Sequence, residues 1–441
     1  MSSINWPSLS FHFFTIALQF RFMKILTVIC AALGYDTFRR CAKSDFWKEL
    51  HTVSSKTVFP ALTSPVQASL RTGLEPSSHG IPANGFFDRN LRKTFFWEQS
   101  SGLYEGERLW GKFRNDGGRV AQICLQQSLG NDSDVIISPA PIHKHHGGMI
   151  QDCYSKPQEL YRELCSKLGH SFNLYDYWGP FTSARSTEWI ADCTAAIMDE
   201  NLSEVIFTYL PHLDYDLQRH GPKCHQEKAA FGILEKQLIK LLRSAKTSGY
   251  EFLILGDYSI ERAERVIHPN RILFENNIFC VREIGQMLYP DMHRSGAFAL
   301  CDHQIAHVYL QDRSMKNSIK DIFRGIKGVQ SVLEPESGGR EGDLLLTAEH
   351  GSWFSYRWWR SAKEAPEYAC HVDIHSKPGF DPCELFFSIW PPFSISLNEN
   401  KVKGTHGLSD GSSGEILCAS SFKISDPSTL VSVSSSIRNM L

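Results

Sequence analysis

The segments SEVIFTYLPHLDYD (203–216) and HQEKAAFGILEKQLIKLLRSAKTSGYEFLILGDYSI (225–260) decide the fold class. The first is rich in β-forming apolar residues, and the second begins with leucines at helical spacing, which predict an amphipathic helix over 226–245. Gly249 marks the end of that helix, and the apolar strand YEFLILGDY follows it. A strand, a helix and a second strand, with acids after both strands, are typical of a parallel α/β sheet.

Further strands are expected on both sides of this unit. KILTVICAALGYD (24–36) is expected to be the first buried strand, and HQIAHVYLQD (303–312) and GDLLLTAEHGSW (342–353) supply later ones. We therefore predict an α/β protein with a mostly parallel central sheet flanked by helices. Ligands of such sheets bind beyond the carboxyl ends of the strands.

The chain divides into one large domain with additions. We expect a single catalytic domain over 23–418, in which residues 90–200, rich in Trp, Tyr and His, form an inserted cap over the active face. Residues 1–22 are expected to be an irregular extension, and the Ser-rich residues 419–441 a loosely held tail.

Composition limits the class of protein. Of 441 residues, 42% are apolar and 21% charged, which predicts a packed globular core. The net charge of −2 favours neither nucleic acid nor an anionic membrane as a partner. Arg21 and Lys24 interrupt the apolar N-terminal run, so no stretch reaches the roughly 20 residues of a membrane span. A signal peptide or a membrane anchor remains the alternative interpretation of this segment. The twelve cysteines include no CxxC pair, which favours free thiols in a reducing, cytoplasmic setting.

The stretch VFPALTSPVQASLRTG (58–73) places small hydroxyl side chains at the start of a helix. Pro65 suits the first turn of that helix, because its missing N–H would have no partner there. Thr63 has two interpretations: it caps the helix, or it is a nucleophile held at the positive helix end, which also favours binding of a phosphate.

Candidate metal ligands follow the predicted strands. Asp214 and Asp257 each follow an apolar run, and two such acids at one sheet edge would suit a divalent cation. His303 and His307 would share one face of a strand because their spacing is even. His375 lies in DIHSKPGFDP and His406 in KVKGTHGLSDG. Solvated acids at strand ends and isolated core histidines remain the simpler alternative.

The run FPALTSPVQASLRTGLEPSSHGIPANG (59–85) resembles the nucleophile segment of the type I phosphodiesterase/nucleotide pyrophosphatase family, in the alkaline phosphatase superfamily. That family carries a Thr before a helix and then TG-x-x-P-x-x-HGI-x-x-N. The matching positions are Thr72, Gly73, Pro76, His79, Gly80, Ile81 and Asn84. The resemblance implies an alkaline phosphatase-like fold. It also implies that Thr63 is a nucleophile forming a phospho- or nucleotidyl-enzyme and that Asn84 hydrogen-bonds a phosphate oxygen.

The same resemblance implies one or two divalent ions, zinc first, with manganese or iron as alternatives. Asp214 and Asp257 match family ligands, and either His375 or His406 matches the late histidine. Three departures stand out: Gln218 and Tyr258 replace family histidines, and the first family acid has no clear match, Asp36 being the nearest. The candidates to compensate are His212, His303, His307 and the cluster His143, His145 and His146.

The expected function is hydrolysis of a small phosphate ester or nucleotide-like substrate by Thr63, with metal ions that lower the pKa of its hydroxyl and stabilise the leaving oxygen. Asn84 would donate to the phosphate oxygens. Trp97, Trp110, Trp178 and Trp189 could stack against a planar group or belong to the core. Two alternatives remain: a phosphomonoester or phosphonate hydrolase with a modified metal site, and a non-catalytic protein that binds phosphorylated ligands.

Overall fold

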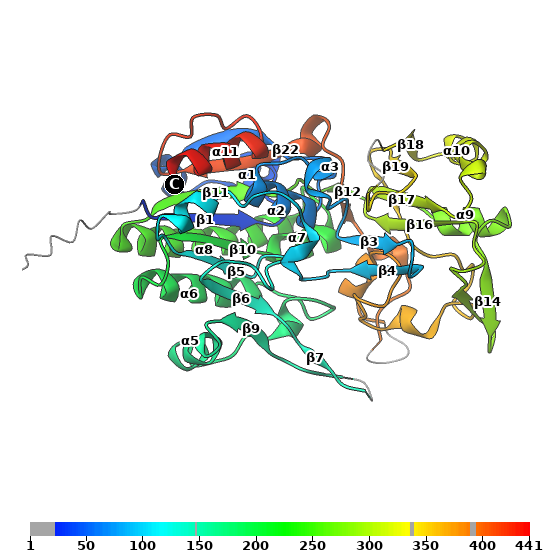
Figure 1. Ribbon diagram of the computed structural model, residues 1–441, viewed down its shortest axis with the longest axis horizontal. Coiled ribbons are helices and arrows are strands. Elements are labelled where there is room, and N and C mark those ends of the chain that lie inside the picture. The colour runs from blue at the N-terminus through cyan, green and yellow to red at the C-terminus, as the bar shows by residue number, and fades with distance from the viewer. Residues whose placement is uncertain (1–22, 146–147, 336–338, 389–393) are drawn as a thin grey trace, which may run out of the picture.

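The computed structural model describes residues 23–145, 148–335, 339–388 and 394–441 (Figure 1). The predicted extension over 1–22 and His146 lie outside the described residues. An eight-stranded sheet forms the centre of the larger part. Its strands, in spatial order, are β2 (His51–Lys56), β22 (Glu415–Ser420), β11 (Glu251–Gly256), β1 (Ile25–Cys30), β10 (Val205–Leu210), β5 (Val120–Ile123), β6 (Val135–Pro139) and β9 (Cys153–Lys156).

The order of the strands confirms the predicted mostly parallel sheet. β11, β1, β10, β5 and β6 pair in parallel with their neighbours. The pairings of β22 with β11 and β2, and of β9 with β6, are antiparallel. The antiparallel strands lie toward the two edges, so the parallel strands occupy the buried centre, as their continuous apolar sequences require.

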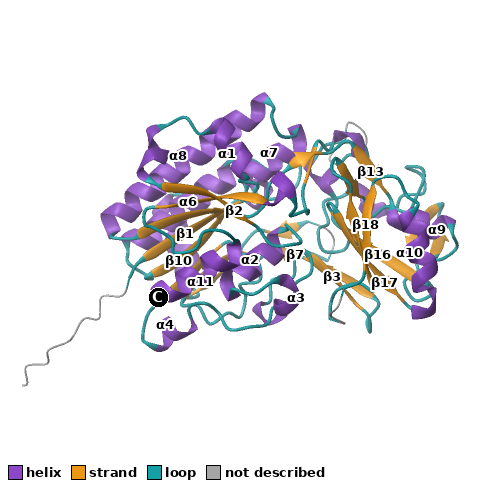
Figure 2. Ribbon diagram, turned by 90° about the horizontal axis from the view of Figure 1, so that it is seen from above, coloured by secondary structure: helices purple, strands orange, loops and turns teal. Residues whose placement is uncertain are grey.

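Helices cover both faces of this sheet (Figure 2). Along β1, Leu26 and Val28 face one apolar layer, whereas Ile25 and Ile29 face the other. The first layer holds α1 (Tyr35–Cys41), α5 (Leu160–Leu168), α6 (Arg185–Asp199), α7 (His212–His220) and α8 (His225–Ser248). The second holds α2 (Thr63–Thr72), α4 (Gly111–Asn115) and α11 (Leu430–Met440). The helix predicted over 226–245 is α8.

A second, smaller part lies beyond one end of the central strands (Figure 1). Its antiparallel sheet consists of β16 (Ala297–Asp302), β17 (Ile305–Leu310), β19 (Leu344–Ala348) and β18 (Val329–Leu333). The helices α9 (Pro269–Glu275) and α10 (Lys316–Arg324) belong to this part, while α3 (Pro76–His79) follows α2. The remaining strands form pairs: β3 (Gly85–Asp88) with β4 (Lys93–Phe96), β7 (Ile142–His143) with β8 (Met149–Ile150), β12 (Glu261–Arg262) with β21 (Gly404–Thr405), β13 (Arg265–Ile267) with β20 (Ser352–Phe354), and β14 (Val281–Ile284) with β15 (Met287–Pro290).

Two regions differ from their sequence-based descriptions. Residues 90–200, expected as a cap, contain β5, β6 and β9 of the central sheet together with α6, so most of this region belongs to the main layers. The smaller part comes instead from later sequence, around the sheet that begins at Ala297. The tail expected over 419–441 ends β22 and then forms α11, which begins with a capping box at Thr429 and Ser432.

The C-terminal helix α11 packs against α2, the helix that begins at Thr63 (Figure 2). The Ser434 hydroxyl donates to the Leu70 carbonyl at 2.7 Å, and the Arg438 guanidinium donates to the Thr72 carbonyl at 2.6 Å. Both contacts satisfy carbonyl groups in the last turn of α2, which have no partners inside the helix. Helix α11 therefore fixes the C-terminal end of α2.

No helix in the described part of the chain is long and apolar enough to cross a membrane.

Replacing Arg438 with Ala is expected to lower the free energy of unfolding by about 1–2 kcal/mol, because the Thr72 carbonyl loses a charged donor. Urea denaturation measures this change. Arg243→Ala on α8, at an exposed position, is the matched control and should change stability by less than about 0.5 kcal/mol. Equal effects of the two substitutions would contradict the role given to α11.

Candidate active site

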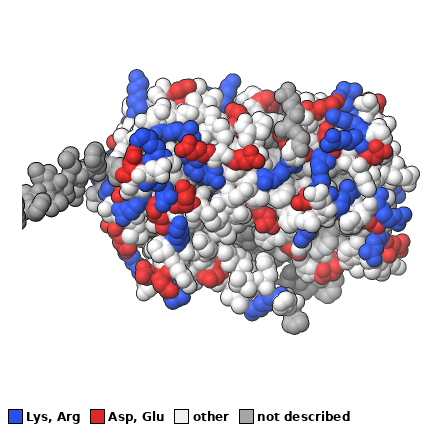
Figure 3. Space-filling view, in the orientation of Figure 1, with Lys and Arg blue, Asp and Glu red and all other residues white. Residues whose placement is uncertain are grey.

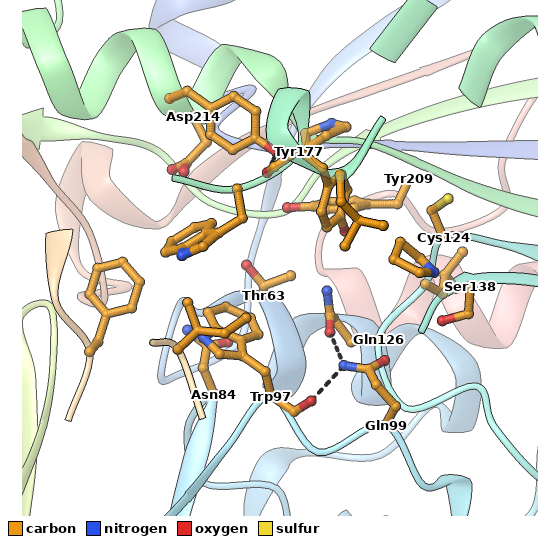
Figure 4. A pocket seen from close by; sticks show the side chains of 18 of the residues that line it. Thr63, Asn84, Trp97, Gln99, Cys124, Gln126, Ser138, Tyr177, Tyr209 and Asp214 are labelled. Carbon is orange, nitrogen blue, oxygen red and sulfur yellow. Dashed lines mark hydrogen bonds between the residues drawn. The ribbon is translucent and has the colours of Figure 1, made fainter. Parts of the chain in front are cut away.

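A pocket lies at the carboxyl ends of the central strands, between the two parts of the molecule (Figure 4). Thr63 comes from α2, Asp214 from α7 after β10, and Tyr258 from the loop after β11. The smaller part contributes His303 from the turn between β16 and β17. The position agrees with the expectation that parallel α/β sheets bind ligands at this edge. Other side chains of the wall are Asn84, Trp97, Gln99, Gln126, Tyr177, Trp178, Tyr209, Gln218, His375, Phe380 and His406.

Thr63 is the first residue of α2, and its hydroxyl faces the pocket rather than the helix. Leu62 is the N-cap, and no side chain of the helix start caps it. The Ser64 N–H instead donates to Asn84 Oδ1 at 3.0 Å. The Thr63 hydroxyl lies 3.5 Å from the Tyr258 phenol oxygen, and Figure 4 shows Thr63 near the centre of the wall. Thr63 therefore does not cap the helix.

Asn84 connects the start of α2 to the smaller part of the molecule. Its backbone N–H donates to Asp302 Oδ2 at 2.9 Å, and its side-chain amide donates to Asp302 Oδ1 at 3.3 Å. Asp302 is the last residue of β16 and is fully buried. Burial raises the pKa of Asp302 to about 7, although both hydrogen bonds from Asn84 act to lower it. The amide thus holds one orientation, with its oxygen on α2 and its nitrogen on Asp302.

Asp214 is in the first turn of α7, one turn after the end of β10. Oδ1 accepts a hydrogen bond from the Tyr258 phenol at 3.1 Å, and Oδ2 accepts one from Gln218 at 2.7 Å. Burial raises the pKa of Asp214 to about 7, and the bonds from Gln218 and Tyr258 oppose that rise. Both oxygens of this carboxylate are thus engaged by neighbouring side chains.

Asp257 is fully buried and does not line the pocket. Oδ1 accepts from the backbone N–H groups of Ala32 and Tyr258, at 2.9 and 2.8 Å. This arrangement requires close contact of the two turns: a Cβ on Gly256 would lie 2.1 Å from the Leu33 carbonyl oxygen. Oδ2 has no hydrogen-bond partner among the described residues, and burial raises the pKa of Asp257 well above its ordinary value. The side chain of Asp257 therefore supports the loop that carries Tyr258.

The histidines of the pocket stack against neighbouring rings. His406 lies parallel to the Tyr258 ring, with centroids 3.6 Å apart and planes at 1°, and its Nδ1 contacts the Ala61 carbonyl at 2.8 Å. His303, at a left-handed backbone position (φ 55°), lies 3.8 Å from His406 and 4.0 Å from Phe380 between ring centroids. Burial lowers the pKa of His406 to about 3, and that of His303 well below its ordinary value. Both rings are neutral near pH 7.

The metal set implied by the family resemblance does not fit these residues. Among the described residues, no group of three or more His, Cys, Asp or Glu side chains is arranged to hold a metal ion. The Tyr258 phenol lies between Thr63 and Asp214, and its ring is stacked on that of His406. Both carboxylate oxygens of Asp214 and Oδ1 of Asp257 accept hydrogen bonds from neighbouring groups. Oδ2 of Asp257 is buried and accepts none from the described residues.

Several predicted residues lie elsewhere. Asp36 is half exposed, forms an ion pair with Arg40 and lines a different cavity. His307 is in β17, and its Nε2 contacts the Pro82 carbonyl at 3.2 Å. Because His303 is in the turn before this strand, the two histidines do not share a strand face, and that prediction is wrong. His375 lies at the pocket, with Nδ1 at 3.0 Å from the Phe96 carbonyl.

Of the candidates to compensate, His212 is buried between Thr187 and the Ala230 carbonyl, at 3.0 and 2.9 Å. His143 is on the exposed strand β7, with its ring 5.9 Å from that of His375. Neither residue lines the pocket. Of the four tryptophans, Trp97 and Trp178 line the pocket with centroids 6.1 Å apart, whereas Trp110 and Trp189 belong to the core.

Sequence reasoning missed two residues of this network. Asp302 follows the strand AFALC as an acid at its end, the same signal that pointed to Asp214 and Asp257, but its partner Asn84 is 218 positions away. Tyr258 was visible only as a departure from the family pattern. Its contacts with Thr63, Asp214 and His406 depend on three separate elements and carry no local signal.

The match to a protein-family model supports the class of phosphoester hydrolases. The family model for type I phosphodiesterase / nucleotide pyrophosphatase matches residues 43–407. The chain therefore belongs to this family.

Two kinds of solved structure share the fold. Phosphonoacetate hydrolase from Sinorhizobium meliloti 1021, in complex with phosphonoformate, is 14% identical, with a TM-score of 0.61 over 95% of this chain and 96% of that chain. An inactive variant of murine ectonucleotide pyrophosphatase / phosphodiesterase 5, in complex with AMP, is 14% identical, with a TM-score of 0.59 over 95% and 94%. At this identity the likeness concerns the fold.

Replacing Asp302 with Ala is expected to destabilise the protein by about 1–3 kcal/mol, because the buried backbone and side-chain donors of Asn84 lose their acceptors. Thermal unfolding measures the loss. Asp302→Asn, which keeps an acceptor oxygen, should fall between this variant and the wild type. Asp321→Ala, at an exposed site on α10, is the control; an Asp302→Ala variant as stable as that control would contradict the connection described here.

Proposed function

We propose that this protein hydrolyses a phosphodiester of a small molecule and that Thr63 is the attacking residue. The observation that carries the proposal is the orientation of Thr63: the residue begins a buried helix, yet its hydroxyl is directed into the pocket beside Tyr258. Membership of the type I phosphodiesterase / nucleotide pyrophosphatase family supports the reaction class.

The proposed reaction has two displacements at phosphorus. Thr63 Oγ1 forms a bond to phosphorus as its O–H breaks, the ester oxygen leaves with the bonding electron pair, and the phosphoryl group remains on Thr63. The released alkoxide takes a proton from solvent and becomes the alcohol. Water then attacks the same phosphorus and loses one proton to solvent, the bond to Thr63 breaks, and Oγ1 regains its own proton. The net reaction consumes one water and releases an alcohol and a phosphomonoester.

The N-terminus of α2 supplies the positive end of a helix dipole beside the reacting group. The Asn84 amide nitrogen is held by Asp302, and the second proton of this amide can donate to a phosphate oxygen. Neither group adds a full positive charge.

Charge favours a diester over a monoester. Among the described residues that line the pocket there is no Lys or Arg, whereas Asp214 contributes a carboxyl group. A phosphodiester has one negative charge and a monoester close to two near neutral pH, so the diester meets less repulsion in this pocket. On the face shown in Figure 3, basic and acidic side chains are interspersed, which agrees with a small-molecule substrate rather than a polyanion.

Aromatic walls support a planar group on the substrate. Trp97, Trp178 and Phe380 contact one another with ring centroids between 5.9 and 6.4 Å apart. Gln99 and Gln126 lie on another side of the pocket and are joined by a hydrogen bond of 2.6 Å, as Figure 4 shows. A substrate with an aromatic or heterocyclic ring could stack on the aromatic wall and form hydrogen bonds with the glutamine amides.

A second candidate function is binding of a phosphorylated ligand without turnover. The observation that favours it is the internal pairing of the site: both oxygens of Asp214 and the amide of Asn84 already have protein partners. A binding protein needs no activated hydroxyl, and the same pocket could hold such a ligand.

The test is turnover of bis(p-nitrophenyl) phosphate by wild type, Thr63→Ser and Thr63→Ala. We expect release of p-nitrophenol by the wild type, a reduced rate for the Ser variant, and a fall of at least about a thousandfold in kcat for the Ala variant, because the nucleophile is gone. Thr247→Ala, exposed on α8, is the matched control and should keep the full rate.

Full activity of Thr63→Ala would contradict the proposed role of Thr63. Binding of p-nitrophenyl phosphate by calorimetry, with no turnover of either ester by any variant, would instead favour the binding function.

A further inference from the structure

We infer that this site works without a divalent cation and that the Tyr258 phenol takes the place of the metal between Thr63 and Asp214. The catalytic part of this inference rests on the proposed function; the statement about metal binding does not. It goes against the expectation that the family resemblance raises, and it stands on the contacts of Tyr258.

Tyr258 occupies the space between the nucleophile and the carboxylate. Its oxygen lies 3.5 Å from Thr63 Oγ1 and 3.1 Å from Asp214 Oδ1, so the phenol bridges the nucleophile and the carboxylate. A catalytic cation that activates a hydroxyl has to contact both the hydroxyl oxygen and its carboxylate ligand. Tyr258 is 2% exposed and packed on both its backbone and its ring, so it does not leave this position by simple rotation into solvent.

The other side chains that could bind a metal ion already contact protein groups. Gln218 donates its amide to Asp214 Oδ2 at 2.7 Å, which uses the second oxygen of that carboxylate. The ring of His406 is parallel to that of Tyr258 at 3.6 Å, so the phenol ring covers one face of this imidazole. Neutral oxygen donors such as an amide or a phenol are poor substitutes for imidazole toward zinc.

The turn after β1, where the family resemblance implies an acidic metal ligand, contains no acid. The turn after β1, residues 31–33, is apolar and fully buried, and the Ala32 N–H donates to Asp257. Asp36, the nearest acid in sequence, is directed to a different cavity and paired with Arg40. Among the described residues, no group of three or more His, Cys, Asp or Glu side chains could hold a metal ion here.

In place of a metal, the hydrogen bonds form a route for a proton. The Thr63 hydroxyl donates to the Tyr258 oxygen, and the Tyr258 hydroxyl donates to Asp214. When Thr63 attacks phosphorus, its proton passes to the Tyr258 oxygen as the phenol proton passes to Asp214. In the second displacement both protons return, so Thr63, Tyr258 and Asp214 end as they began.

The binding experiment uses the purified full chain and zinc alone. After dialysis against EDTA, we expect elemental analysis to find less than about one tenth of an equivalent of Zn, Mn or Fe, and calorimetry with ZnCl₂ to show no saturable binding at the site. The double variant Gln218→His/Tyr258→His removes the bridging phenol and adds two imidazoles beside Asp214 and His406, and it is expected to bind zinc at least about tenfold more tightly than the wild type.

The kinetic experiment follows bis(p-nitrophenyl) phosphate hydrolysis. EDTA is expected to leave wild-type kcat unchanged, and Tyr258→Phe to lower kcat by at least about a hundredfold with little change in KM, because the proton route is broken. The matched control is Tyr250→Phe, which removes another buried phenol, one that donates to the Ser203 carbonyl away from the pocket.

Each result has a separate meaning. Stoichiometric metal in the wild type, loss of activity in EDTA that zinc restores, or a double variant that binds zinc no better than the wild type would overturn this inference. Full activity of Tyr258→Phe would overturn the proton route. A metal-free wild type that turns over neither diester nor monoester contradicts the proposed function, while the inference about metal binding stands.

Discussion

The N-terminus of helix α2 is the constraint on which the site depends. Helix α2 is buried along its whole length, packed on the central sheet and held at its C-terminal end by α11. At its start, Asn84 accepts from the Ser64 N–H and donates to Asp302, which ties the helix to the second sheet. Because both ends are fixed, the Thr63 hydroxyl has a defined position relative to Asp214 and Tyr258.

The chemistry of the pocket follows from that position. Asn84, and not Thr63, accepts the N–H at the start of α2, which leaves the Thr63 hydroxyl available. The surrounding groups are neutral or hydrogen-bonded rather than cationic. The pocket therefore differs from a site built to hold highly charged phosphate through metal ions. Family membership supports the phosphoester hydrolase class, and the proposed substrate is a less charged ester with a planar group.

Long apolar patterns made much of the fold predictable. The periodicity of residues 226–245 and the apolar strands beside them are local properties, and they correctly predicted a mostly parallel sheet. The sequence did not predict the end of β22 or α11, because the Ser-rich composition of residues 419–441 is typical of a loosely held tail. The apolar residues of α11 are buried only through tertiary packing with α2. The sequence also did not predict that residues 90–200 contribute strands to the central sheet. Strands as short as β5 have too few residues for a recognisable hydrophobic pattern.

The candidate site was predictable to the extent that its residues follow sequence motifs. Thr63, Asn84 and Asp214 line one pocket. Both late histidine candidates, His375 and His406, line it as well. Asp36 lies elsewhere, because the turn after β1 is apolar and the acid falls on the outer side of α1. The positive φ of His303 and the stacking of Tyr258 on His406 depend on tertiary contacts that no spacing rule contains.

The most direct measurement is mass spectrometry of peptides from protein that has been mixed with a diester and quenched in acid. The account predicts a covalent phosphoryl adduct on the peptide that contains Thr63, formed in the presence of EDTA. An adduct on a different residue, or turnover with no adduct on any peptide at times shorter than one catalytic cycle, would contradict the claim that the Thr63 hydroxyl attacks phosphorus.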